Sequence, residues 1–440
     1  MIIALKLFLG VFCFLNLASY AQPIQIKTFY DDSTKSKLKE VYYFRSYSDS
    51  TIEGEYKKYY ESGPLETLGF YKNGKKDSIY TDYYPKGEIK AKYKFSNGLR
   101  QGDFVGFAPD GKIIQKAVYV DDKLQDTIIT FYHTGTIKSK TRFVDGMIQG
   151  KVFEFYPTTV LKSVAEFKDN KPDGLTLTYY PNGVKKTEEN YKKGVLNGFY
   201  KTYYSNGILE TESVNENGKS EGYFKNYFPS GKLSMEGTYR SGEQHGQTKV
   251  YFESGKLKME LNFVNGKKSG VCKVFHENGK LKEKINYSNE EKDKTVVVFN
   301  ENGTKIGDFT FADKMKTGLW KHYHDNGKLK CTENYLNDRL NGERKLYNEQ
   351  GLLIAHEIYN PAGKKNGLCS YFYDDGKPKE VLTFRADLLQ GPAKYHAPEG
   401  FVSKEGVYLN GQMHGKWKVS EDGKSFKTLI YKYGKLESEK

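Results

Sequence analysis

The sequence predicts an all-β fold: an elongated single antiparallel sheet of successive β-hairpins, coiled or trough-shaped, with no helix after residue 18. Two observations support this prediction. First, the chain repeats itself every 24 residues, and a fixed short period is typical of arrays in which each unit touches mainly its neighbours. Second, each repeat contains two glycine-containing turn sequences that separate runs rich in Tyr, Phe, Val, Thr and Lys, the pattern of paired strands.

The repeat is defined by an opening position, which is glycine in most copies. It recurs sixteen times, and one extra residue in the 360–363 turn displaces the last three copies by one. The opening residues are Gly54, Ser78, Gly102, Asp126, Gly150, Gly174, Gly198, Gly222, Gly246, Gly270, Lys294, Gly318, Gly342, Gly367, Gly391 and Gly415. We therefore expect sixteen hairpins in one register over residues 54–423.

The block that opens at Gly246 illustrates the expected hairpin. A first strand ends at the turn of residues 253–255 (Glu-Ser-Gly), and a second strand ends at the turn of residues 264–266 (Val-Asn-Gly). Asn and Gly supply the positive φ angles that tight strand reversals need. In the second strand, Leu257, Met259, Leu261 and Phe263 alternate with polar residues, which predicts that all four face one way from a half-buried strand.

Aromatic columns give the expected core. The fifth residue after the opening position is aromatic in the first fourteen repeats, and the sixth is often aromatic as well. Adjacent strand residues point to opposite faces, so either both faces are covered there or one ring lies over a turn. We expect the rings, the leucines of the second strand and a later aromatic column to form one apolar stripe; members of these columns are Tyr203, Tyr227, Tyr251, Leu209, Leu233, Leu257, Tyr71, Phe95 and Tyr119.

The N-terminus reads as an export signal. Lys6 precedes an apolar run at residues 7–18, and residues 19–21 (Ser-Tyr-Ala) form a small-x-small cleavage site. The run is too short to span a membrane. We expect residues 1–21 to be a signal peptide and the protein to be exported, to the periplasm, the outer envelope or the medium. Residues 22–53 are expected to form N-terminal capping strands, and residues 424–440 a C-terminal capping strand and tail.

Charge and cysteines narrow the partners. The net charge is +14, and lysines share one column in many repeats, which is typical of a solvated sheet face. The basic excess favours polyanionic partners such as anionic lipid, glycan or acidic protein, and nucleic acid is not the expected partner of an exported chain. Cys272 and Cys369 occupy a column that is apolar in other repeats, so we expect packed thiols rather than a disulfide.

The repeat pattern G-x-ϕ-x-x-ϕ-Y-x-x-G-K-L-K-x-x-x-x-Y-x-x-G-K-x-x resembles the MORN repeat, specifically the bacterial variant often labelled as the YwqK-type antitoxin family. The blocks that open at Gly246 and Gly318 fit best, and Ser78, Asp126 and Lys294 depart from the opening glycine. The resemblance implies antiparallel sheets of successive hairpins, with roles in protein association and proposed roles at membranes. An export signal disagrees with the antitoxin label, because that label implies a cytoplasmic protein.

No catalytic, cofactor-binding or metal-binding motif stands out, so we expect a protein that is not an enzyme and takes no cofactor. His322 and His324 share one face of a strand, but no third metal ligand is placed near them. The region that departs most from the repeat pattern, residues 270–341, contains the candidate binding residues Trp320, His322, Tyr323 and His324, because Trp and Tyr are frequent anchors of binding patches.

The leading hypothesis is an exported non-catalytic repeat scaffold that binds a protein or cell-envelope partner through multivalent contacts along the sheet. One alternative is an antitoxin or immunity-type inhibitor that caps a specific toxin, which predicts tight binding at a few divergent repeats. A second is adhesion to anionic lipid or glycan through the lysine columns, which predicts steep loss of binding with salt. The sequence leaves the partner's identity and the oligomeric state open.

Overall fold

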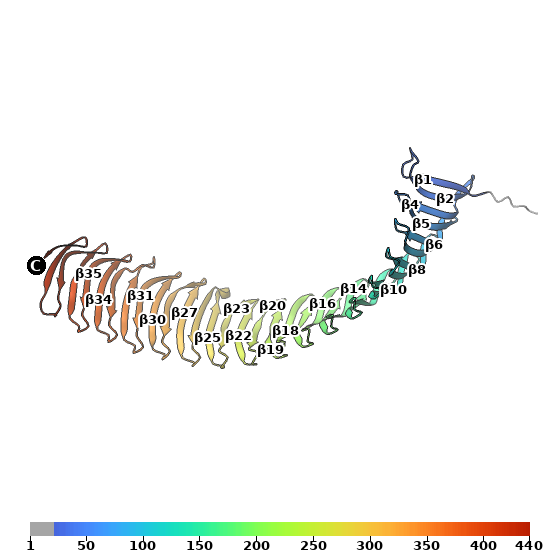
Figure 1. Cartoon of the computed structure of the whole chain (residues 1–440). Helices are drawn as coiled ribbons and strands as arrows, with labels where there is room; N and C mark the ends of the chain where they lie inside the picture. The colour runs from blue at the N-terminus through green and yellow to red at the C-terminus, as the bar shows by residue number, and fades with distance from the viewer. Residues whose placement is uncertain (1–21) are drawn as a thin grey trace, which may run out of the picture. The chain divides into compact units, whose positions relative to one another are not determined.

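The computed structural model describes residues 22–440, so the predicted signal peptide at residues 1–21 lies outside the described residues. The described chain forms two compact units, which we call unit 1 (residues 22–195) and unit 2 (residues 196–440). Each unit is an open antiparallel sheet in which strands pair with their neighbours in sequence (Figure 1). The predicted all-β class of successive hairpins is confirmed.

Unit 1 contains two capping hairpin strands followed by repeats of two strands each. Its strands are β1 (Ile24–Phe29), β2 (Leu38–Ser46), β3 (Asp49–Ile52), β4 (Gly54–Tyr59), β5 (Leu65–Lys72), β6 (Lys75–Tyr83), β7 (Ile89–Ser96), β8 (Leu99–Phe107), β9 (Ile113–Val120), β10 (Lys123–Phe131), β11 (Ile137–Val144), β12 (Met147–Phe155), β13 (Leu161–Lys168), β14 (Lys171–Tyr179) and β15 (Lys185–Lys192).

Unit 2 continues the same pattern from the second residue of β16. Its strands are β16 (Val195–Tyr203), β17 (Leu209–Glu216), β18 (Lys219–Tyr227), β19 (Leu233–Arg240), β20 (Glu243–Gln244), β21 (Gly246–Tyr251), β22 (Leu257–Val264), β23 (Lys267–Lys268), β24 (Gly270–Phe275), β25 (Leu281–Ser288), β26 (Asp293–Phe299), β27 (Lys305–Ala312), β28 (Met315–Lys316), β29 (Gly318–Tyr323), β30 (Leu329–Leu336), β31 (Arg339–Tyr347), β32 (Leu353–Tyr359), β33 (Gly367–Phe372), β34 (Pro378–Arg385), β35 (Leu388–His396), β36 (Val402–Leu409), β37 (Gln412–Val419), β38 (Lys427–Lys432) and β39 (Lys435–Glu439). The last two strands pair as a hairpin within residues 424–440.

The opening glycine lies in a β-bulge. In the repeat that opens at Gly342, Glu333 pairs with Arg344 and Tyr335 pairs with Leu340, so one residue of β30 lies opposite three residues of β31. Gly342 has a φ of 91°, a left-handed conformation that glycine adopts without steric cost. Ser78 and Asp126 keep the same bulge with φ angles of 65° and 62°.

Lys294 replaces the opening glycine and removes this bulge. Strands β25 and β26 pair without a register shift from Glu283 to Ser288. The two extra residues lie instead in the connection, which contains the 3-10 turn η1 (Asn289–Glu291), the only helical element of the described residues. No α-helix occurs among residues 22–440, as predicted. Asn289, Glu290 and Glu291 carry the positive φ angles that a lysine at the bulge would resist.

A second bulge, between the fourth and fifth residues after the opening position, corrects the predicted faces. Val250 pairs with Met259 but Tyr251 pairs with Leu257, so Leu257 and Met259 face opposite ways. Side-chain contacts agree: Lys305, at the position equivalent to Leu257, forms a 2.7 Å ion pair with Asp308 three residues on. The fifth-position rings and the second-strand leucines therefore share one face, and the later aromatic column lies on the other.

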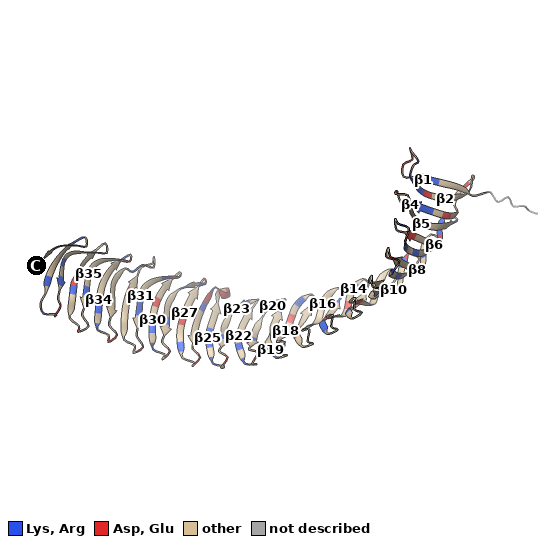
Figure 2. Ribbon diagram, viewed as in Figure 1, with Lys and Arg blue, Asp and Glu red and all other residues tan. Residues whose placement is uncertain are grey.

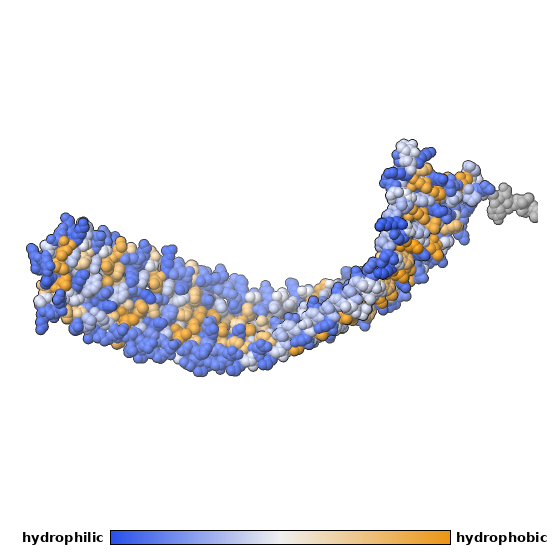
Figure 3. All heavy atoms as spheres, viewed as in Figure 1, coloured by the Kyte–Doolittle hydropathy of each residue, from blue (hydrophilic) through white to orange (hydrophobic). Residues whose placement is uncertain are grey.

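We call the face that carries the second residue after each opening position the ring face, and the opposite face the lysine face. Tyr80 and Trp417 are 1% and 0% exposed on the ring face. Each lies over a glycine of the preceding strand: a Cβ atom at Gly406 would lie 2.2 Å from the Trp417 indole. Ring pairs with the later aromatic column, such as Tyr80–Phe95 at 4.9 Å between centroids, extend this core. Figure 3 shows hydrophobic residues gathered over β5–β8.

The sixth-position rings lie over turns, which decides between the two alternatives for that column. Their hydroxyls donate hydrogen bonds of 2.7–2.9 Å to the main-chain carbonyl 23 residues later, in the next repeat. The residues are Tyr60, Tyr84, Tyr132, Tyr156, Tyr204 and Tyr373. This ladder ties neighbouring turns together, so each repeat depends on the one that follows it.

Candidate binding surfaces

A hollow of about 700 Å³ opens on unit 2 beside the turns after β29 and β31. Its apolar wall comes from Ile306, Leu346 and Ile354, and its polar wall from His322, Glu333 and Arg344. A hollow of this size with a few convergent polar groups is the usual form of a small-ligand or side-chain pocket. It is the first of two candidate binding surfaces.

Three of the four predicted binding residues line this hollow, and Trp320 does not. His322, Tyr323 and His324 are lining residues. Trp320 is buried on the ring face, where its Nε1 donates to the Thr310 carbonyl at 2.9 Å and its ring packs 4.6 Å from that of Phe309. Trp320 is thus a core residue, and its side chain is not available as an exposed anchor.

The two histidines have different environments. His324 forms a 2.9 Å hydrogen bond between Nε2 and the Tyr347 carbonyl, the same ladder contact that the sixth-position tyrosines make. His322 instead faces Glu333, with 3.5 Å between Nε2 and Oε2. The structure therefore does not bring the two rings together. Across residues 22–440 no group of three or more His, Cys, Asp or Glu side chains is arranged to hold a metal ion.

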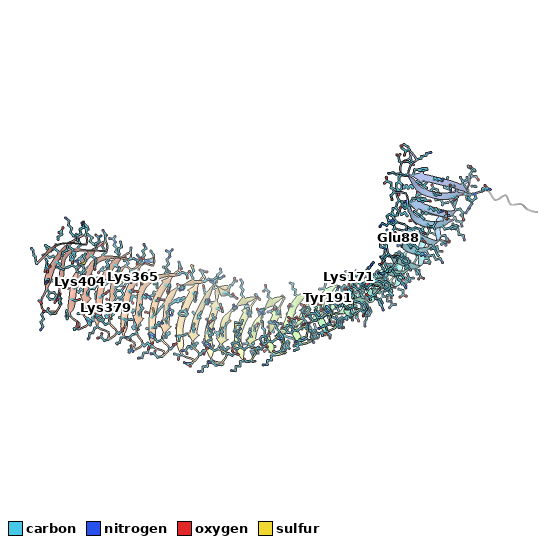
Figure 4. All side chains as sticks on the ribbon, viewed as in Figure 1. Glu88, Lys171, Tyr191, Lys365, Lys379 and Lys404 are labelled. Atoms are coloured by element: carbon cyan, nitrogen blue, oxygen red, sulfur yellow. The ribbon has the colours of Figure 1, made fainter. Side chains whose placement is uncertain are left out.

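Behind the hollow lies a network of buried charges. Arg344 bridges two carboxylates, with its Nε 3.1 Å from Glu333 and its Nη1 3.0 Å from Glu357. Lys365, labelled in Figure 4, completes the network: its Nζ is 2.7 Å from Glu357 and 2.8 Å from the Tyr371 hydroxyl. The side chain of Glu357 is only 6% exposed, so these contacts replace the water that an exposed carboxylate would bind.

The network keeps both carboxylates ionised. The pKa of Glu333 falls to about 2, because His322 hydrogen-bonds to it, and Tyr335 and Arg344 add to the effect against the opposing influence of burial. Burial alone would raise the pKa of Glu357, but hydrogen bonds from Lys365, Tyr359, Tyr371 and Arg344 outweigh it and lower the value to about 2.

The pKa of the Cys331 thiol, which lines the hollow, is shifted in the opposite direction. Burial raises the pKa of Cys331 to about 11, so the thiol is protonated at neutral pH and is a poor nucleophile. The groups at the hollow therefore suit recognition of a ligand by shape and fixed charge.

The network was missed in the sequence, although a signal was present. Arg344 stands in the column that holds Tyr80, Phe224 and Trp320 in other repeats. Glu333 and Glu357 stand in a column that holds glycine, alanine or an aromatic residue in many repeats. A charged residue in a core column is the exception that marks a buried polar network.

The second candidate surface is an exposed apolar row on the lysine face. It consists of the first residue after the opening position in five repeats of unit 2, with exposed fractions between 39% and 52%. Its members are Phe199, Tyr223, Val271, Leu319 and Leu368. Apolar side chains in line on an open sheet face are a common feature of protein interaction surfaces.

With the fold and both surfaces described, comparison with protein families becomes informative. Seven segments match the family model of the MORN repeat variant: residues 52–73, 172–193, 220–241, 244–265, 268–289, 316–337 and 365–386. Their starts differ by multiples of 24 residues until the last, which is displaced by one, as the sequence predicts. The chain is a repeat protein that contains MORN repeats. The two blocks that fit the pattern best, at Gly246 and Gly318, are among the matches.

Comparison with other proteins adds little to this assignment. No curated protein matches the chain. Among solved structures, it is similar to TcdB2-TccC3 at 12% identity, with 88% of this chain and 24% of that chain covered and a TM-score of 0.16. It is also similar to the Photorhabdus luminescens Tc holotoxin pore at 11% identity, with 90% and 25% covered and a TM-score of 0.15. The chain spans about a quarter of these chains.

Among residues 22–440, no helix has the length and apolar character needed to cross a membrane.

Proposed function

We propose that the protein is an exported, non-catalytic scaffold that binds a protein or cell-envelope partner at several repeats at once. The observation that carries this proposal is the exposed apolar row on the lysine face, in which side chains such as Phe199 and Leu368 are about half exposed. Each of these repeats alone offers one such side chain. A partner that spans several repeats gains many weak contacts at one cost of association, so the array binds as a multivalent surface.

Photo-crosslinking tests the proposal. A benzophenone amino acid is placed singly at positions 199, 223, 271 and 319, and the chain is irradiated with an envelope fraction of its source cells. Position 264 is the matched control, because Val264 is 49% exposed but lies at the end of β22, outside the row. The scaffold function predicts one partner crosslinked from three or more row positions and not from 264. Crosslinks that are equally strong from 264, or absent from the row, would overturn it.

The hollow favours a second candidate function, the inhibitor that caps one partner. It has the volume and the fixed charges to receive a single side chain or chain end. A benzophenone at position 346, in the hollow wall, separates the two functions. An inhibitor would crosslink from 346 and from no position more than one repeat away, whereas a scaffold would crosslink from the row.

A further inference from the structure

The lysine faces of the two units differ in which residues lie across the strands from their lysines. In unit 2, Lys225 pairs across the strands with Glu212 on one side and Glu236 on the other. Lys249 likewise lies between Glu236 and Glu260. We call this alternation of Lys and Glu the charge ladder. Figure 2 marks basic residues in blue and acidic residues in red on these strands.

The same row in unit 1 contains lysines without carboxylates. Lys92 lies between Thr81 and Val105, and Lys116 lies between Val105 and Ile129. Lys140 lies between Ile129 and Phe153 in the same way. We call this stretch the open row. On this face, Asp103 is the acidic side chain nearest in register to the open row.

We infer that the open row binds an extended acidic segment of a partner protein. Unit 2 provides the template for this pairing, because there the chain itself places a glutamate on each side of Lys225 and of Lys249. Opposite charges placed across from each other on neighbouring strands stabilise a sheet surface. In unit 1 the equivalent carboxylates are missing from the chain and would come from the partner.

The spacing of the open row specifies the form of the partner. Equivalent residues of successive repeats are two strands, or about 9.6 Å, apart. A polyproline II segment rises about 3.1 Å per residue, so every third residue returns to the same side after about 9.3 Å. An acidic residue at every third position would therefore meet Lys92, Lys116 and Lys140 in turn. The intervening prolines would lie on Val105, Ile129 and Phe153, as apolar grooves receive prolines elsewhere.

A protein segment fits this row better than a lipid surface does. Val105, Ile129 and Phe153 are half-buried between the lysines. Side chains that bind a bilayer must project well beyond their neighbours to reach the acyl chains. The row is thus shaped to receive a chain that lies along it. This inference rests on the scaffold function. It specifies the lysine face of unit 1 as the binding surface and an acidic segment as the chemistry of one partner.

Binding of a defined peptide tests the inference on the purified chain. The probe is a fluorescein-labelled peptide of five Glu-Pro-Pro triplets, and the control peptide has the same composition with its glutamates contiguous. Fluorescence anisotropy at low ionic strength should show tighter binding of the triplet peptide. Replacing the open-row lysines together (Lys92→Gln, Lys116→Gln, Lys140→Gln) should weaken it about tenfold or more, since three charge pairs are lost.

A matched triple variant in the charge ladder (Lys201→Gln, Lys225→Gln, Lys249→Gln) removes the same net charge and should leave binding unchanged. Equal weakening by both variants would show that only net charge matters and would overturn the inference. So would unchanged binding by the open-row variant, or capture of phosphatidylglycerol vesicles through the same lysines without peptide binding. If no partner were crosslinked from positions 199–319 of the exposed apolar row while the peptide still bound to the open row, only the scaffold function would be contradicted.

Discussion

Unit 1 and unit 2 are built from the same kind of repeat. They differ in the residues of two rows of side chains, one on the lysine face and one on the ring face. On the lysine face, the row through Lys116 alternates lysine with apolar residues, whereas the row through Lys225 alternates lysine with glutamate. Both units keep the hairpin backbone, and both keep the bulge at the opening position except at Lys294 of unit 2. The comparison teaches that turns, bulges and buried rings set the fold, while the exposed rows are free to diverge and to carry function.

The ring faces differ as well. In unit 1 the core column is filled by residues such as Tyr80, with its hydroxyl 3.0 Å from the Phe70 carbonyl. In unit 2 the same column contains Arg344, which pairs with the carboxylates of Glu333 and Glu357 in a neighbouring column. Unit 2 therefore stores part of its stability in charge pairs that depend on pH, and unit 1 stores more of it in ring packing.

The largest expected effect comes from removing a buried ring. Tyr80→Ala in unit 1 and Trp417→Ala in unit 2 should each cost about 3–5 kcal/mol of unfolding free energy, because both rings are almost fully buried. Hydrogen exchange should rise in the repeats next to the substitution and stay unchanged in the other unit. Phe199→Ala, at a half-exposed ring, is the control and should change stability by less than about 0.5 kcal/mol. Exchange that rises evenly through both units would contradict the one-dimensional array.

Arg344→Met should cost about 3 kcal/mol, the low end of the range for breaking a buried ion pair, because Glu333 and Glu357 then lack their shared cation. Denaturant unfolding monitored by exchange in β30–β34 measures this cost. Replacing all three residues (Glu333→Gln, Arg344→Met, Glu357→Gln) should recover much of it, since no carboxylate is then left without its cation and Lys365, which loses its partner, is 28% exposed to water. A triple variant less stable than Arg344→Met would show that shape rather than charge governs the network.

Acid should weaken unit 2 at this network. The pKa values of Glu333 and Glu357 are lowered from 4.5 to about 2 by folding. A lowered carboxylate pKa stabilises the fold above the unfolded value, and this stabilisation is lost as the pH falls from about 4.5 toward 2. The loss is at most about 3 kcal/mol for each carboxylate. Exchange measured over this pH window should rise in β30–β34 in the wild type, and much less in the Glu333→Gln, Glu357→Gln variant.

Much of the fold could be predicted from the sequence, because the same pattern of turns and strands occurs in sixteen repeats. The period, the turns and the extra residue near position 360 were all correct, and Cys272 and Cys369 are buried as their column predicted. The bulge between the fourth and fifth residues was not predicted, because an alternating pattern gives no sign of where pairing slips by one. The face of Leu257 was therefore assigned wrongly.

The candidate site was only partly readable. His322, Tyr323 and His324 were singled out and do line the hollow. Trp320 was chosen because tryptophan is a frequent anchor, but its column is the most buried one in the fold. Comparing Trp320 with Tyr80 and Phe224 in that column would have placed it in the core. The same comparison would have identified Arg344 as a charged residue in a mainly apolar column.

The smallest expected effect is the difference in stability cost between a lysine removed from the charge ladder and a lysine removed from the open row. Lys225→Ala removes a lysine with a glutamate on each side and should cost about 0.5–1 kcal/mol. Lys116→Ala removes a lysine between two apolar residues and should change stability by less than about 0.5 kcal/mol. Denaturant midpoints at low and high salt give both values, and only the Lys225→Ala cost should shrink with salt. Equal costs would mean that the ladder contributes nothing.

A reciprocal exchange of the two rows tests the central claim most directly, namely that a common fold carries function in its exposed rows. In one variant, Val105→Glu and Ile129→Glu turn the open row into a charge ladder. A second pair of changes, Glu212→Val and Glu236→Val, turns the ladder in unit 2 into an open row. Hydrogen exchange with the Glu-Pro-Pro peptide bound locates the protected strands. The account predicts that protection moves from β7–β12 to β16–β21 when both changes are combined. Protection that stays on β7–β12, or that appears on neither unit in a folded variant, would contradict it.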